Sequence, residues 1–161
     1  MRDFLVTHAN LPRGARLWTF GAPGYLDDDG WRLEEGKVYA RGGYLDLEFD
    51  AATATLLSPP DQVIRTGTMG SLVPGLRDAA SLAAMQIFGR IDDKSPWVAI
   101  GAPIPAARFQ HVDAGVRVPL AWPSALRAKG TIVAELKIVL AFNTGVTNAR
   151  LDRVALYPRT N

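Results

Sequence analysis

Residues 130–142 read GTIVAELKIVLAF and decide the fold class. Every second residue from Ile132 to Phe142 is apolar, and the positions between them include the charged Glu135 and Lys137. A period of two is the pattern of a β-strand that turns one face to the core. The many β-branched residues and the glycine before the stretch favour a strand over a helix. We therefore expect a long strand here, with Glu135 and Lys137 on its solvent side.

Other stretches repeat the alternation. In Tyr44–Phe49, Asp46 and Glu48 stand between apolar residues, as in a strand with one wet face. Ala149–Tyr157 alternates in the same way and ends at Pro158. Weaker patterns predict strands at Asp3–Thr7, Arg16–Phe20, Lys37–Arg41, Thr53–Leu57, Gln86–Ile91, Trp97–Ile100, Arg108–Val112 and Val116–Leu120. The predicted core comprises Leu45, Leu47, Phe49, Ile132, Leu136, Ile138, Leu140, Val154 and Leu156.

Turn residues divide the chain at short intervals. The 161 residues include 15 glycines and 11 prolines, which are spread throughout and not collected in a linker. This spacing suits about eight to ten short strands, and pairing should be antiparallel because long crossovers are lacking. We expect one domain, residues 1–161, that is all-β: a two-sheet antiparallel sandwich of the jelly-roll kind, with a barrel as the alternative. Residues 77–84 are rich in helix formers and leave room for one short helix.

Composition excludes several classes of protein. Hydrophobic residues make up 48% of the chain, which is typical of a globular protein. The absence of cysteine excludes disulfides, thiolate zinc sites, iron–sulfur clusters and cysteine nucleophiles. The amino terminus lacks the apolar run of a signal peptide, and no stretch is long enough to span a bilayer. We expect a protein made in the cytoplasm without a signal peptide and with no membrane partner.

The net charge is +2, and arginine dominates the basic residues, with 14 arginines against 4 lysines. An arginine bias suits bidentate contacts at protein and phosphate interfaces, and a GC-rich genome produces the same bias without a functional cause. No run of like charges is present, and arginines alternate with acids, as in Arg150-Leu151-Asp152-Arg153. Nucleic-acid binding is therefore not expected.

The residues needed for common enzyme chemistry are few and scattered. The two histidines, His8 and His111, lie far apart and show no metal-binding spacing. The sequence around Ser71 fails the nucleophile-elbow pattern, and both phosphate-binding loop motifs are absent. Glu48 and Glu135 could form the carboxylate pair of a glycosidase. Their positions on the solvent-facing sides of strands favour two solvated surface residues without a catalytic role. We expect no catalytic residues and no enzyme activity.

Asp27, Asp28 and Asp29 concentrate carboxylates in one turn before Gly30. Calcium prefers such oxygen ligands, although the loop lacks the spacing and the closing glutamate of an EF-hand. A solvated acidic turn is the main interpretation, and a calcium site is the alternative. No other cofactor is expected.

Four aromatic residues are candidate ligand contacts because they lie near turns or prolines: Trp31, Tyr44, Trp97 and Trp122. Aromatic residues at strand ends and in loops can stack on sugar rings or anchor subunit interfaces. For each tryptophan the alternative is a partly buried indole that caps the sandwich. Trp18, amid apolar neighbours, is expected in the core.

The carboxyl end, residues 148–157, reads NARLDRVALY. Asp152, Val154 and Leu156 form an Asp-x-Val-x-Leu strand, which follows the long apolar strand and a short turn. This arrangement resembles the end of jelly-roll carbohydrate-binding modules. The resemblance implies the jelly-roll fold, which also builds capsid decoration (cement) and tail-associated proteins of bacteriophages. It therefore supports the fold more than any ligand.

Two functions fit these observations. The main prediction is a non-enzymatic virion structural protein, a phage capsid decoration or tail-associated protein. It would bind a repeating protein lattice such as a major capsid protein, or itself as a homo-oligomer, and would leave the cytoplasm in the virion. This reading is favoured because the chain starts at Met1 without an export signal and carries one domain with nothing catalytic. The alternative is a carbohydrate-binding module that recognises a glycan through loop aromatics.

Overall fold

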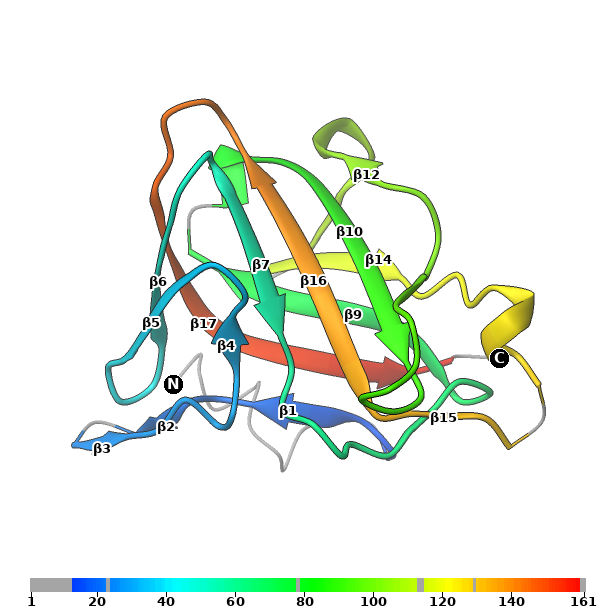
Figure 1. Ribbon diagram of the computed structural model, residues 1–161. Coiled ribbons are helices and arrows are strands. Elements are labelled where there is room, and N and C mark those ends of the chain that lie inside the picture. The colour runs from blue at the N-terminus through cyan, green and yellow to red at the C-terminus, as the bar shows by residue number, and fades with distance from the viewer. Residues whose placement is uncertain (1–12, 23, 78, 113–114, 129, 160–161) are drawn as a thin grey trace.

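The protein is a sandwich of two antiparallel sheets, which confirms the predicted fold class (Figure 1). The computed structural model describes residues 13–22, 24–77, 79–112, 115–128 and 130–159. The larger sheet has the order β13 (Gln110–Val112), β14 (Gly115–Pro119), β9 (Met69–Leu76), β17 (Asn148–Pro158), β6 (Leu45–Phe49) and β5 (Gly36–Ala40), and β1 (Arg16–Trp18) pairs with β17. The smaller sheet has the order β11 (Val98–Ala99), β10 (Leu82–Arg90), β16 (Glu135–Phe142), β7 (Thr53–Leu57) and β4 (Arg32–Leu33), and β12 (Ile104–Pro105) pairs with β10.

Several short elements lie along the connections between the strands of the two sheets. Two pairs of two-residue strands lie outside them: β2 (Gly21–Ala22) with β3 (Tyr25–Leu26), and β8 (Ile64–Arg65) with β15 (Ile132–Val133). Short 3-10 turns form at Ala79–Ser81, Ala106–Arg108 and Ser124–Leu126. Among the described residues, no helix has the length and apolarity needed to cross a membrane.

The chain passes back and forth between the two sheets. From β6 it crosses to β7, returns to β9, crosses to β10, returns to β14, crosses to β16 and ends in β17. Figure 1 shows β7, β16 and β10 running in front of β9, β14 and β17. This alternation gives the jelly-roll-like arrangement, and it turns one face of each sheet inward.

The core fills the space between the sheets. Of the nine predicted core residues, eight are buried: Leu45, Leu47, Phe49, Leu136, Ile138, Leu140, Val154 and Leu156. Phe49 and Phe142 stack with their ring centroids 5.1 Å apart, so they tie the two sheets together at one end. The alternation of the sequence therefore identifies the inner face of each long strand.

Ile132 is the ninth residue, and its prediction is wrong. Its side chain is only partly buried, whereas the neighbouring Val133 is fully buried. The stretch is not one strand, because β15 pairs with β8 and a new strand starts at Glu135. The break at Ala134 shifts the alternation by one residue, which places Val133 and Leu136 on the inside.

Strand β9 is central to the larger sheet, yet the sequence analysis does not predict it. It pairs with β14 on one side and with β17 on the other. Pro74 and the glycines around it resemble a turn, since proline cannot donate to a sheet ladder. Its ladder to β14 covers only Ser71 and Leu72, so no ladder pair with β14 is formed at Pro74, although the backbone of Gly115 in β14 packs closely against Pro74 and Gly75. Pro74 therefore needs no backbone N–H for a ladder bond to β14.

The short helix predicted near residues 77–84 is only the 3-10 turn Ala79–Ser81. Strand β10 begins at Leu82, and its buried Met85 and Ile87 alternate with half-buried residues. Tertiary packing thus overrides the local helix preference of the alanines. The predicted strand Asp3–Thr7 lies outside the described residues.

The packing of β16 predicts how substitutions along it will behave. Ile138→Ala removes a fully buried side chain and should lower the free energy of unfolding by about 2–5 kcal/mol, because the cavity cannot collapse completely. Val139→Ala, one position away on the outer side, is the control and should cost less. Urea denaturation of both variants measures the difference, and equal losses would contradict the assigned inner face.

Candidate functional site

The outer side of the smaller sheet is a broad surface of half-buried and exposed side chains, which we call the β16 face. Its members point away from the core from β10, β16 and β7: Ala84, Gln86, Phe88, Arg90, Lys137, Val139, Ala141, Thr53, Thr55 and Leu57. The strand register places Leu57, Lys137 and Phe88 in one row across the sheet. A neighbouring row contains Thr55, Val139 and Gln86. The face therefore combines aromatic, charged and hydroxyl groups.

Aromatic and cationic side chains gather at the β10 edge of this face. The Cζ atom of Arg90 lies 4.2 Å from the ring centroid of Trp97. The Nζ atom of Lys137 lies 4.9 Å from the same centroid and 4.8 Å from that of Phe88. These are cation–π distances, and the Trp97 side chain itself is half-buried. Two cations thus hold the indole in place on the sheet.

The loop before Trp97 is tied by its own side chains. Asp92 Oδ1 accepts hydrogen bonds from the Ser95 hydroxyl and the Lys94 backbone N–H. The Ser95 contact, followed by that backbone bond, holds the pKa of Asp92 below its ordinary value. This turn fixes the path of the chain between β10 and Trp97.

Glu135 is a carboxylate buried on the β16 face. Its exposure is only 3%, and its Oε1 accepts from Nε and Nη2 of Arg90 at 2.8 and 2.6 Å. Its Oε2 accepts from Nη2 of Arg32 at 2.7 Å. Strand alternation predicts a solvated Glu135, and this prediction is wrong because the two arginines cover the carboxylate. Glu48 projects from β6 in the other sheet, so the two glutamates do not form a pair.

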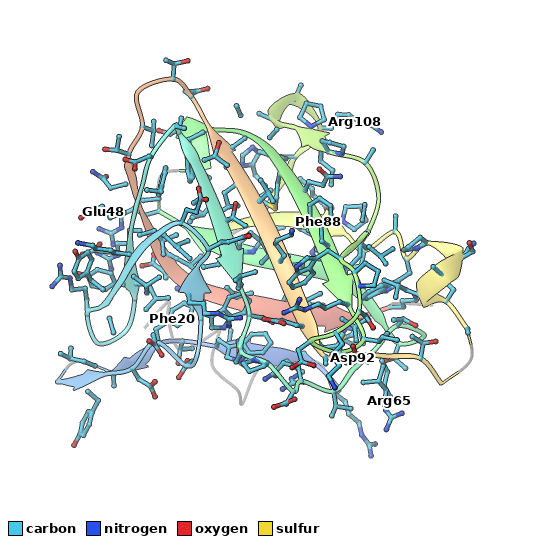
Figure 2. The ribbon with its side chains drawn as sticks, viewed as in Figure 1. Phe20, Glu48, Arg65, Phe88, Asp92 and Arg108 are labelled. Carbon is cyan, nitrogen blue, oxygen red and sulfur yellow. The ribbon has the colours of Figure 1, made fainter. Side chains whose placement is uncertain are left out.

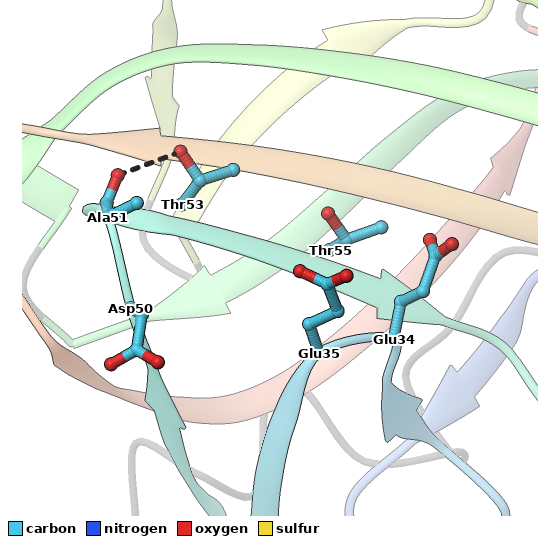
Figure 3. A pocket seen from close by; sticks show the side chains of 6 residues that line it. All are labelled: Glu34, Glu35, Asp50, Ala51, Thr53 and Thr55. Atoms are coloured by element: carbon cyan, nitrogen blue, oxygen red, sulfur yellow. Dashed lines mark hydrogen bonds between the residues drawn. The ribbon is translucent and has the colours of Figure 1, made fainter.

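An acidic pocket lies at the other edge of the β16 face. It has a volume of about 330 Å³ and is lined by Glu34, Glu35, Asp50, Ala51, Thr53 and Thr55. Figure 3 shows the carboxylates of Glu34 and Glu35 near Thr55, with Asp50 on the far side of the pocket. The Glu34 backbone N–H donates to the Thr55 carbonyl, which attaches this edge to β7. These oxygens can accept hydrogen bonds from a ligand.

The four aromatic residues predicted as ligand contacts differ in burial and location. Trp31 and Trp122 are buried, at 1% and 4% exposure, and the Trp122 indole donates to the Met69 carbonyl. These two indoles therefore serve the core and present no face to a ligand. Tyr44 is half-buried beside β6, with Arg150 Cζ 3.6 Å from its ring centroid. Of the four, only Trp97 joins the β16 face.

In the candidate calcium loop, the carboxylates of Asp27, Asp28 and Asp29 accept hydrogen bonds from backbone N–H groups. Asp27 Oδ1 accepts from the Asp29 N–H, and Asp28 Oδ1 accepts from the Gly30 N–H. Asp29 Oδ2 accepts from the Phe20 N–H, and burial raises the pKa of Asp29. Within the described part of the chain, no three acidic, histidine or cysteine side chains are grouped to hold a metal ion. The calcium reading stays a prediction.

Among the described residues, no histidine belongs to a group of side chains that could hold a metal ion. His111 is exposed and lines a second cavity of about 340 Å³, together with Arg77, Asp152 and Arg153. It approaches Phe109 edge-on, with ring centroids 6.4 Å apart. His8 lies outside the described residues.

Sequence reasoning did not single out Phe88, Arg90 and Lys137. Their outward direction follows from strand alternation, and the sequence analysis does place Lys137 on the outer side. Their contact follows from the register of β10 against β16, in which Phe88 lies opposite Lys137. Figure 2 shows Phe88 on this face, with Asp92 at the lower end of the same region. No local sequence signal encodes that register.

Comparison with known proteins adds little to this geometry. No family model matches the chain, and no curated protein matches its sequence. Among solved structures, the chain is similar to a carbohydrate-binding module specific for non-crystalline cellulose. The TM-score is 0.46 and the identity 14%, over 92% of this chain and 97% of that one. Because both values are low, this similarity does not assign a family or a ligand.

Proposed function

We propose that this domain binds a carbohydrate on the β16 face, with Trp97 as the stacking platform. The observation that carries the proposal is the half-buried indole of Trp97, held by Arg90 and Lys137 on the open side of a sheet. A sugar presents an apolar C–H face and hydroxyl edges, so it needs a flat apolar ring beside hydrogen-bonding groups. Both are present here.

The platform is fixed before any ligand arrives. Arg90 and Lys137 project from the sheet, so we infer that they contact the ring from below and leave its other side to solvent. Arg90 is itself held by the buried Glu135. A ring ordered in this way loses little conformational entropy on binding, which favours affinity.

Hydrogen-bonding groups extend from the platform across the sheet. Gln86 lies on β10, Thr55 on β7 and Glu34 just after β4. The strands from β10 to β4 are three spacings apart, or about 14 Å at about 4.8 Å each. That span accommodates several polar contacts along an extended ligand. The proposed activity is binding without turnover.

The proposal predicts that Trp97→Ala lowers glycan affinity by at least about tenfold, since a central aromatic contact dominates such sites. Isothermal titration calorimetry against soluble polysaccharides measures the affinity. Tyr39→Ala removes an exposed aromatic ring on β5 of the other sheet and should leave binding unchanged. Binding that survives Trp97→Ala, or no binding to any polysaccharide, would contradict the proposal.

A second candidate function is assembly, as in the predicted virion role, and one surface favours it. Tyr25 and Leu26 in the β2–β3 pair are 75% and 72% exposed, the highest values among the large exposed hydrophobic residues of the described chain. Phe20, next to β2, is fully buried and anchors the pair to the body. An anchored apolar projection suits contact with a protein lattice or a second copy.

The assembly role, in its homo-oligomer form, predicts that the protein self-associates through Tyr25 and Leu26. Light scattering on the purified chain should then give an oligomer that dissociates in a Tyr25→Ser/Leu26→Ser variant. A strict monomer would exclude self-association, and an oligomer that survives this variant would exclude the hairpin as its contact.

A further inference from the structure

We propose that the β16 face selects an anionic carbohydrate, one that carries carboxylate or sulfate groups, and that Lys137 provides the selectivity. The inference rests on the proposed carbohydrate binding and names the chemical class of its ligand. It follows from the charges around Trp97.

The platform end of the β16 face carries excess positive charge. Arg32, Arg90 and Lys137 supply three cations, and Glu135 supplies one carboxylate. Both oxygens of Glu135 are already occupied by the two arginines. Within the described residues, Lys137 has no carboxylate within ion-pair distance. With Asp92, Asp93 and Lys94 of the adjoining loop included, this end has one positive charge in excess, and Lys137 is the cation beside Trp97 that has no carboxylate partner among the described residues.

Lys137 is placed to donate to a ligand. Its Nζ lies between the rings of Phe88 and Trp97, at 4.8 and 4.9 Å from their centroids. Ring contacts hold the ammonium, but they give its three N–H groups no lone-pair acceptor. In the described part of the chain, no side-chain hydrogen bond of Lys137 supplies one either. An anion on a sugar stacked at Trp97 would provide charge-assisted hydrogen bonds.

The acidic pocket does not cancel this charge. Glu34 and Glu35 follow β4, which lies two strand spacings, or about 10 Å at about 4.8 Å each, from β16, the strand of Lys137. This spacing exceeds the Debye length of about 8 Å at physiological ionic strength, so salt screens much of the interaction between the carboxylates of the pocket and Lys137. The pocket repels anions at its own edge. The anionic group of a ligand is therefore directed to the Trp97 end.

Matched polymers test the inference. Polygalacturonate and its fully methyl-esterified form differ in carboxylate charge, and dextran sulfate and dextran differ in sulfate charge. The protein should bind the charged member of at least one pair about tenfold or more tightly. Preference within only one pair identifies the anion as carboxylate or as sulfate. The preference should weaken as NaCl rises from about 0.05 M to about 0.5 M.

Variants assign the effect to Lys137. Lys137→Gln should abolish the preference for the charged polymer, and Lys137→Arg, which keeps the charge, should retain most of it. Lys37→Gln removes the same charge from β5 of the other sheet and should change nothing. Urea denaturation of each variant checks that it is folded.

The outcomes separate the two proposals. Equal affinity of the unaltered protein for the charged and uncharged members of both pairs would overturn the selectivity and leave carbohydrate binding in place. A preference that persists in folded Lys137→Gln would overturn the role of Lys137. Failure to bind any of the four polymers or the other polysaccharides would overturn both proposals.

Discussion

A carboxylate buried on the outer side of a sheet constrains much of this structure. Glu135 begins β16, and its two oxygens hold Arg90 at the end of β10 and Arg32 on β4. One side chain therefore connects three strands of the smaller sheet. A buried carboxylate is costly unless it is paired and hydrogen-bonded, so the two arginines are fixed in place as well.

The fixed position of Arg90 explains how the aromatic side chains of the β16 face are ordered. Arg90 contacts the ring of Trp97, and Lys137, two residues along β16 from Glu135, contacts the rings of both Trp97 and Phe88. Arginines cover aromatic rings elsewhere too, as Arg150 does at Tyr44 and Arg117 at Tyr157. The arginine bias of the sequence thus corresponds in part to stacked cations that order aromatic side chains. On the β16 face this ordering produces a platform beside hydrogen-bonding groups.

The sequence predicts the parts of the fold that local alternation controls. Strands β6, β16 and β17 follow from their period of two, and their inner residues are buried. Strand β9 is not predictable from local pattern because Pro74 and its glycines resemble a turn, and the burial of Ile132 is not predictable because the alternation shifts at Ala134. Both depend on which strand lies alongside, and a local pattern does not contain that information.

The candidate site was less predictable for the same reason. Trp31, Trp97 and Trp122 all follow turns or prolines, yet two are core residues and one is on the β16 face. Glu135 has the position of a solvated residue, and its burial depends on Arg32, which is distant in sequence. Sequence identified Trp97 as a candidate. Only the strand register placed Lys137 and Phe88 beside it.

The most direct test of this account is the free energy of unfolding of Arg90→Ala beside that of Arg41→Ala. Both arginines pair with a carboxylate and contact an aromatic ring, but Arg90 holds the buried Glu135 and Arg41 holds the exposed Asp46. Arg90→Ala should cost about 3–5 kcal/mol because it leaves a buried charge poorly compensated. Arg41→Ala should cost about 0–1 kcal/mol. Equal small losses in urea denaturation would show that Glu135 does not organise this face.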